Sequence, residues 1–89
     1  MLDPIYKNIF KKDIKLAEKR GFDLKKLKEM IRMLVEEEPL PKKYRDHALI
    51  GNYAGHRECH IQPDWLLIYK KEVNTVIFER TGTHADLFK

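Results

Sequence analysis

Residues 56–80, HRECHIQPDWLLIYKKEVNTVIFER, decide the fold, because three segments with strand character follow one another here with only short connections. The segments are residues 56–61, which alternate loosely, the apolar run 65–69, and residues 75–80, rich in β-branched and aromatic side chains. Pro63-Asp64 marks the first turn and residues 72–74 mark the second. Connections this short join antiparallel neighbours, so the stretch predicts an antiparallel meander.

The part of the chain before this stretch has a helical pattern. Apolar residues recur at helical spacing from Tyr6 to Ala17, and again from Leu24 to Leu34. Gly21 is a typical residue just past a helix end, and Asp23 is a typical N-cap for the next helix. We expect Pro39 and Pro41 to stop this second helix.

Two helices joined by so short a turn form a hairpin with one shared apolar face. Followed by the meander, the hairpin predicts a single α+β domain over residues 1–89, with the helices on one side of a twisted antiparallel sheet. The other side of the sheet is then expected to be free as a working surface. A chain of 89 residues has a modest core, so we expect any active site to be a shallow groove.

Composition narrows the function classes. The net charge of +4 is compatible with a polyanionic partner, without proving one. The single cysteine, Cys59, excludes an internal disulfide and a cysteine-based zinc site. No run approaches the roughly 18–20 apolar residues of a membrane helix, and no signal peptide is recognisable, so we expect a cytoplasmic protein with no membrane partner.

Polar and aromatic residues with catalytic potential gather in the second half of the chain. They are His47, His56, Glu58, His60, Asp64, Trp65, Arg80, His84 and Phe88. Histidine exchanges protons near neutral pH. Cleavage of RNA through its own 2′-hydroxyl needs a base, an acid and a cation beside the phosphate, which two histidines, a carboxylate and an arginine would supply.

Plainer interpretations compete with this one. Asp64 is by default a turn residue, and Trp65, at the head of an apolar strand, is by default core. Arg80 shares strand parity with Val76 and Phe78, so it should face inward unless the strand end is open. The histidines could instead be surface residues or metal ligands, although no HxH or HExxH pattern supports a metal.

Taken together, three segments closely resemble the YafQ branch of the RelE toxin superfamily. They are residues 44–51 (YRDHALIG), 57–69 (RECHIQPDWLLIY) and 78–88 (FERTGTHADLF). The resemblance runs essentially end to end and includes residues 11–20 (KKDIKLAEKR).

The resemblance implies a helical hairpin on a twisted antiparallel sheet. It also implies a ribosome-associated endoribonuclease that cuts mRNA without a metal or other cofactor, silenced by an antitoxin encoded beside it. We expect a monomer when the antitoxin is absent. The alternatives are a non-catalytic module of the same fold that binds RNA or antitoxin, and a metal-dependent nuclease.

The resemblance also implies site residues. His84 is the expected general acid. His60 and Asp64 form the expected base side of the site, and in this interpretation they act as a coupled pair. The remaining expected members are Arg80 as phosphate clamp, His47 as a further acid–base member, Phe88 as a base-stacking aromatic, Trp65 as a second substrate-binding aromatic, and Glu58, at the substrate in a catalytic or electrostatic role. His56 has no counterpart and is expected at the surface.

Overall fold

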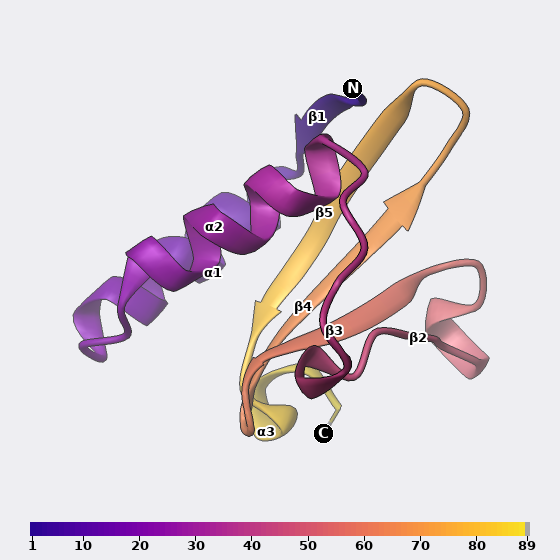
Figure 1. Cartoon of the computed structure of the whole chain (residues 1–89). Helices are drawn as coiled ribbons and strands as arrows, with labels where there is room; N and C mark the ends of the chain where they lie inside the picture. The colour runs from indigo at the N-terminus through magenta and orange to yellow at the C-terminus, as the bar shows by residue number, and fades with distance from the viewer. Residues whose placement is uncertain (89) are drawn as a thin grey trace.

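The computed structural model describes residues 1–88, built around a five-stranded sheet of strand order β1-β5-β4-β3-β2 (Figure 1). The strands are β1 (Asp3–Tyr6), β2 (His47–Ala48), β3 (Arg57–Gln62), β4 (Trp65–Lys71) and β5 (Thr75–Gly82). The α-helices are α1 (Asn8–Lys19), α2 (Leu24–Val35) and α3 (His84–Leu87), with short 3₁₀ helices η1 (Lys42–Tyr44) and η2 (Gly51–Tyr53). None of the helices in residues 1–88 has the length and apolar character needed to cross a membrane.

The predicted meander is confirmed, since β3, β4 and β5 pair antiparallel in chain order. Two strands had no clear sequence signal. β1 pairs parallel with β5, from Asp3 opposite Thr75 to Tyr6 opposite Phe78, and β2 extends the other edge through two residues paired with β3. The α+β class is confirmed, but the sheet is mixed rather than purely antiparallel.

The helical hairpin has the expected punctuation at its turn. Gly21 adopts φ +81°, and the Asp23 carboxylate accepts a hydrogen bond from the Lys25 backbone N–H at 3.0 Å. The expectation that prolines stop α2 is wrong in position. The helix ends at Val35, and Glu37 takes a left-handed φ of 58° before Pro39 is reached.

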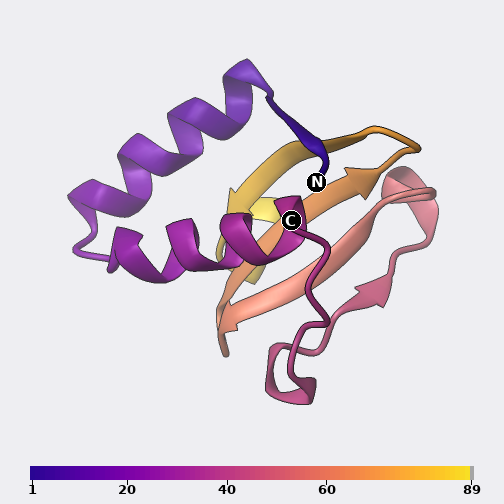
Figure 2. The same cartoon turned by 45° about the horizontal axis from the view of Figure 1, so that its top comes forward.

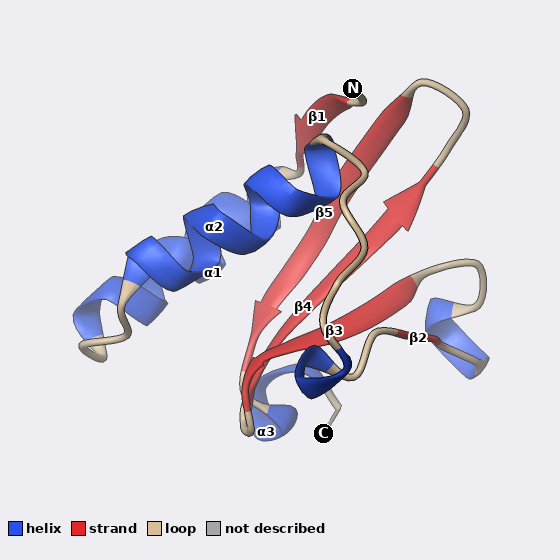
Figure 3. Cartoon of the chain, viewed as in Figure 1, coloured by secondary structure: helices blue, strands red, loops and turns tan. Residues whose placement is uncertain are grey.

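Both long helices cover one side of the sheet, as Figures 2 and 3 show. The main core fills the space between these two helices and the sheet. Its largest members are fully buried: Phe10 from α1, Leu27 from α2, Trp65 from β4 and Phe78 from β5. Alternation along β3 directs Cys59 and Ile61 into this core.

The opposite face of the sheet is not bare, which corrects the expectation of a free polar surface. Leu66 and Ile68 of β4 pack there with Leu87 of α3, and Leu49 and Tyr53 of the β2–β3 connection lie against them. This second apolar cluster covers the middle of the face. The polar side chains are therefore left at its borders.

Candidate active site

Strand register places the candidate polar residues on the face opposite the long helices. His47 lies opposite Glu58, Glu58 opposite Ile68, and Ile68 opposite Arg80, so the four residues form one row across four strands. His60, two residues beyond Glu58, lies opposite Leu66 in the next row. Directly opposed residues share a face, so this row defines the working side of the sheet.

A β-bulge brings Arg80 to this face. Tyr69 pairs with Phe78 while its neighbour Ile68 pairs with Arg80, so Glu79 is the extra residue. Without the bulge, Arg80 would point into the core with Phe78. The expectation from strand alternation that Arg80 faces inward is therefore wrong, because the bulge reverses the alternation.

Arg80 is held in place by α1. Its Nε and Nη2 atoms donate to the two Asp13 oxygens at 2.7 and 3.1 Å, and the same carboxylate accepts from the Thr81 backbone N–H at 3.1 Å. The hydrogen bond to Asp13 is the main cause of the raised pKa of Arg80, so the guanidinium stays charged. This side-on pair uses Nε and Nη2, so the Asp13 carboxylate does not engage Nη1.

Glu58 joins two of the histidines. Its Oε2 lies 3.2 Å from His47 Nε2 and 3.5 Å from His60 Nε2, and its side chain is only 6% exposed. His47 Nδ1 lies 2.6 Å from the Arg45 carbonyl oxygen, which fixes that ring from its other side. A buried carboxylate between two imidazoles can orient both rings through their Nε2 atoms.

Asp64 belongs to His84, which corrects the expected pairing with His60. The Asp64 carboxylate oxygen Oδ1 accepts from the His84 backbone N–H at 2.9 Å and lies 2.6 Å from His84 Nδ1. These two hydrogen bonds hold the pKa of Asp64 below its usual range. Because Nδ1 faces the carboxylate, the Nε2 atom of His84 is left for substrate.

His84 begins the short helix α3, which lies where β5 ends and β3 turns into β4 (Figure 1). Thr83 and Asp86 form a capping box at its N-terminus, and Asp86 also binds Arg20 at 2.6 Å. Gly82, at the end of β5, has no positive φ. Its lack of a side chain leaves room for Asp86, since a Cβ there would lie 3.0 Å from the Asp86 oxygen Oδ2.

The two aromatic candidates have different surroundings. Trp65 is 1% exposed, donates from Nε1 to Thr81 Oγ1 at 2.9 Å, and packs on Phe22 in the main core. It does not join the histidines, and the core interpretation replaces substrate binding for this residue. Phe88 is 44% exposed, with its ring centroid 6.4 Å from that of His84.

Three residues near the site had no role assigned from sequence. Asp13 anchors Arg80, and Tyr53 contacts Phe88 at a ring-centroid distance of 5.8 Å. His56, expected at the surface, is only 18% exposed and lies 3.3 Å from Glu79. The loop glycines flanking Tyr53 were the only local signal that this segment has a specific shape.

One group in residues 1–88 could hold a metal ion. His47, Glu58 and His60 each offer a ligand atom, and these atoms lie within 4.8 Å of one another. Imidazole and carboxylate ligands suit zinc, copper or nickel. Sequence motifs for metal ligands do not detect this group, because the pairing of β2 with β3 brings His47 beside Glu58 and His60.

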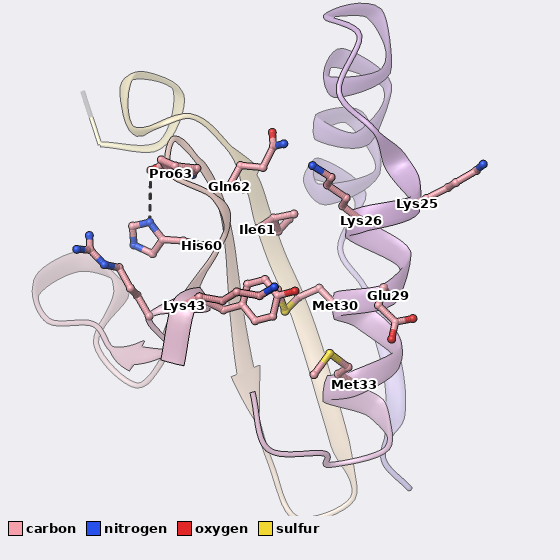
Figure 4. Close-up of a pocket in the computed structure, with 12 residues that line it drawn as sticks. Lys25, Lys26, Glu29, Met30, Met33, Lys43, His60, Ile61, Gln62 and Pro63 are labelled. Carbon is pink, nitrogen blue, oxygen red and sulfur yellow. Dashed lines mark hydrogen bonds between the residues drawn. The ribbon is translucent and has the colours of Figure 1, made fainter. Parts of the chain in front are cut away.

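A groove lies beside this cluster rather than over it. It has a volume of about 790 Å³ and runs between α2, η1 and β3 (Figure 4). Met30, Met33 and Ile61 line its floor, and His60 lies at one end and points away from Ile61. Its rim carries the cationic side chains of Lys25, Lys26, Lys43 and Arg45.

Comparison with known proteins places this geometry in a family. Residues 2–89 match the family model described as the bacterial toxin of type II toxin–antitoxin system, YafQ. The chain is 49% identical to the mRNA interferase toxin YafQ of Escherichia coli K12 over 84 residues, which are 93% of this chain and 91% of the relative.

Solved structures agree. YafQ in the E. coli DinJ–YafQ complex is 47% identical, with a TM-score of 0.93 and full coverage of both chains. A metal-bound toxin from Helicobacter pylori is 43% identical, with a TM-score of 0.91, covering 99% of this chain and all of that one. With its helical hairpin, its mixed sheet and its paired histidine–carboxylate units, this chain belongs to the YafQ family of type II toxin–antitoxin toxins.

Proposed function

We propose that this toxin is a ribosome-associated endoribonuclease that cuts mRNA by histidine acid–base catalysis. One observation carries the proposal. The rings of His60 and His84 lie 5.8 Å apart between centroids, and each ring has its own carboxylate, Glu58 and Asp64 respectively. The E. coli relative is an mRNA interferase toxin, which supports the same reaction.

The proposed reaction is transfer of the phosphate to the neighbouring 2′-oxygen. The His60–Glu58 unit takes the proton of the 2′-hydroxyl as its oxygen forms a bond to phosphorus. The bond from phosphorus to the 5′-oxygen breaks, and His84 Nε2 gives its proton to that oxygen. The products are a 2′,3′-cyclic phosphate and a 5′-hydroxyl end.

Arg80 supplies the cation for this step. Ile68 of β4 separates it from Glu58, so its strand lies about 10 Å from β3, a span that a guanidinium can bridge toward a phosphate. The charge on the phosphate oxygens grows in the transition state, where the Nη1 group of Arg80, which Asp13 does not bind, would donate a hydrogen bond. His47 supports the base side through Glu58.

No step in this proposal needs a metal. If His47, Glu58 and His60 bound zinc or copper, the metal would occupy the Glu58 carboxylate and one ring nitrogen of His60, so the His60–Glu58 unit could not take the proton as proposed. A metal at that position would therefore inhibit the proposed reaction rather than assist it.

The proposed partner is an acidic antitoxin that folds onto the cationic surface of a monomeric toxin in the cytoplasm. Lys25, Lys26, Lys43 and Arg45 form no ion pair within residues 1–88, and the methionine floor between them is apolar. An antitoxin segment with carboxylates flanking apolar anchors fits this groove by charge and polarity. That E. coli YafQ has been solved with DinJ supports an antitoxin partner.

Cleavage of a translated message tests the function. Ribosomes carrying a defined mRNA are incubated with wild-type protein or with His60→Ala, His84→Ala or Arg32→Ala, the last changing an arginine of an exposed network on α2. We expect wild type and Arg32→Ala to produce 2′,3′-cyclic phosphate ends and both histidine variants to lose about 100-fold or more. A folded wild-type protein that binds RNA without cutting it would favour the non-catalytic module instead.

A further inference from the structure

The connection between β2 and β3 forms a closed loop over residues 49–56. The Leu49 N–H donates to the His56 carbonyl at 2.9 Å, and the His56 N–H donates to the Tyr53 carbonyl at 2.9 Å. Gly51 and Gly55 adopt φ of +72° and +87°, conformations that other residues rarely take. These hydrogen bonds and glycines fix where the loop places Tyr53.

Tyr53 is directed back over the sheet rather than into solvent. Its half-buried ring packs against the second apolar cluster of Leu66, Ile68 and Leu87. It meets the ring of Phe88 at 79° with centroids 5.8 Å apart, and that of His56 at 80° and 6.0 Å. Tyr53 stays partly exposed and Phe88 is 44% exposed, so a further aromatic group can reach part of each ring.

His56 supports the Tyr53 ring from beneath. Both of its ring nitrogens are inaccessible to solvent and form no hydrogen bond of good geometry within the described residues, although Nε2 lies 3.3 Å from Glu79. A buried imidazole without hydrogen bonds is costly to fold.

The rings form an ordered series across the site. Successive centroid distances are 5.8 Å from His60 to His84, 6.4 Å from His84 to Phe88, and 5.8 Å from Phe88 to Tyr53. Tyr53 and Phe88 are therefore connected to the two histidines through His84. In the proposed reaction, His84 protonates the oxygen of the nucleotide that leaves, which is the nucleotide 3′ to the cut.

Charge at this end of the series suits a nucleotide. Arg80 lies on the same face, and Tyr53 is close enough to contribute, after Asp13, to the raised pKa of that arginine. Aromatic rings stack on nucleobases while a nearby guanidinium contacts the phosphate, a combination common in proteins that bind single-stranded RNA.

We propose that Tyr53 and Phe88 form a nucleobase-binding site for the nucleotide immediately 3′ to the cut. This inference rests on the proposed ribonuclease function, which assigns the leaving nucleotide to His84. It makes Tyr53 a substrate-binding residue and the loop 49–56 a recognition element. Tyr53 binds the base by stacking, so Phe or Trp at this position should replace it.

The test uses the whole protein and short RNAs made uncleavable by 2′-O-methylation. One RNA carries all its bases, a second is abasic 3′ to the cleavage position, and a third is abasic 5′ to it. Affinities are measured by fluorescence anisotropy for wild type, Tyr53→Ala, Tyr53→Phe and Ile50→Ala, a control in the same loop whose side chain is 90% exposed. Thermal melts confirm that each variant is folded.

We expect Tyr53→Ala to weaken binding of the complete RNA by about 5- to 100-fold, the range for one stacked base. Tyr53→Phe and Ile50→Ala should stay within about threefold of wild type. The abasic site 3′ to the cut should weaken wild type similarly but leave Tyr53→Ala unchanged, because the stacking partner is already missing.

Other results would overturn the inference. Equal binding of the complete RNA by Tyr53→Ala and wild type would show that Tyr53 does not bind a base. If Tyr53→Ala is instead insensitive to the abasic site 5′ to the cut, Tyr53 binds the nucleotide 5′ to the cut and the inference is wrong. If Tyr53→Ala unfolds, Tyr53→Trp replaces it, and a folded Trp variant that binds more than tenfold worse would exclude stacking. Wild-type cleavage of a normal message, measured in parallel, separates these failures from a failure of the ribonuclease function.

Discussion

Replacing Asp64 with asparagine tests the pairing of Asp64 with His84, which the structure shows in place of the expected pairing with His60. Asp64→Asn keeps an oxygen that can accept from His84 but removes the negative charge. The Asp64 and His84 side chains are 64% and 54% exposed, so water screens their attraction. We therefore expect cleavage to slow by no more than about tenfold, against about 100- to 10,000-fold for His84→Ala.

The double variant shows through which group Asp64 acts. Asp64 Oδ1 contacts the backbone and the ring of His84, and in residues 1–88 no hydrogen bond joins it to His60. If its effect passes through His84, then Asp64→Asn/His84→Ala should cut as slowly as His84→Ala alone.

The assay is single-turnover cleavage of ribosome-bound mRNA with the four proteins of this cycle. Asp3→Asn, an exposed change on β1, serves as the control for loss of one negative charge. Thermal melts exclude unfolding as the cause of any loss. Effects that multiply in the double variant would refute the reasoning and return Asp64 to the base side with His60.

Three further predictions concern the phosphate clamp, acid stability and metals. Arg80→Ala should weaken RNA binding and slow cleavage by about 100-fold, measured as the concentration dependence of single-turnover rates, because one transition-state donor is lost; an unchanged rate would exclude the clamp. The pKa of Asp86 is lowered, mainly by the hydrogen bond that it accepts from Arg20. The ionised Asp86 therefore contributes its full share to the stability of the folded protein above the ordinary aspartate pKa of about 4, and this contribution is lost as pH falls further. The difference in melting temperature between wild type and Asp86→Asn should therefore shrink as pH falls below about 4, and a constant difference would contradict this. A chelator should leave cleavage intact, whereas added zinc should inhibit wild type through His47, Glu58 and His60; activity that returns only with zinc would overturn the metal-free mechanism.

The fold was predictable where its signals are local. The meander follows from strand periodicity and two short turns, and the hairpin from Gly21 and the Asp23 cap. β1 was missed because its four residues are all exposed, so they lack the apolar alternation of a strand. Its parallel partner lies more than 70 positions along the chain, a pairing that no local pattern encodes.

The site was predictable as a set of residues but not as a set of pairs. Resemblance indicated both histidines and both carboxylates, yet it paired Asp64 with His60, its near neighbour in sequence. That proximity is misleading, because Asp64 lies in the turn after β3 and α3 brings His84 back to that turn. Trp65 was misassigned for a related reason, since a family motif does not distinguish a residue that contacts substrate from one that supports the strand.

The division of the site between two kinds of scaffold has a consequence for its stability. The base unit lies on paired strands, so His60 and Glu58 keep their places as long as the sheet is folded. The acid unit depends on α3, a single turn held by its capping box and by the bond between Asp86 and Arg20. A helix this short has little stability of its own, so its contacts must supply it. Changes that loosen α3 should therefore remove the acid and abolish cleavage while the sheet, and most of the melting transition, remain intact.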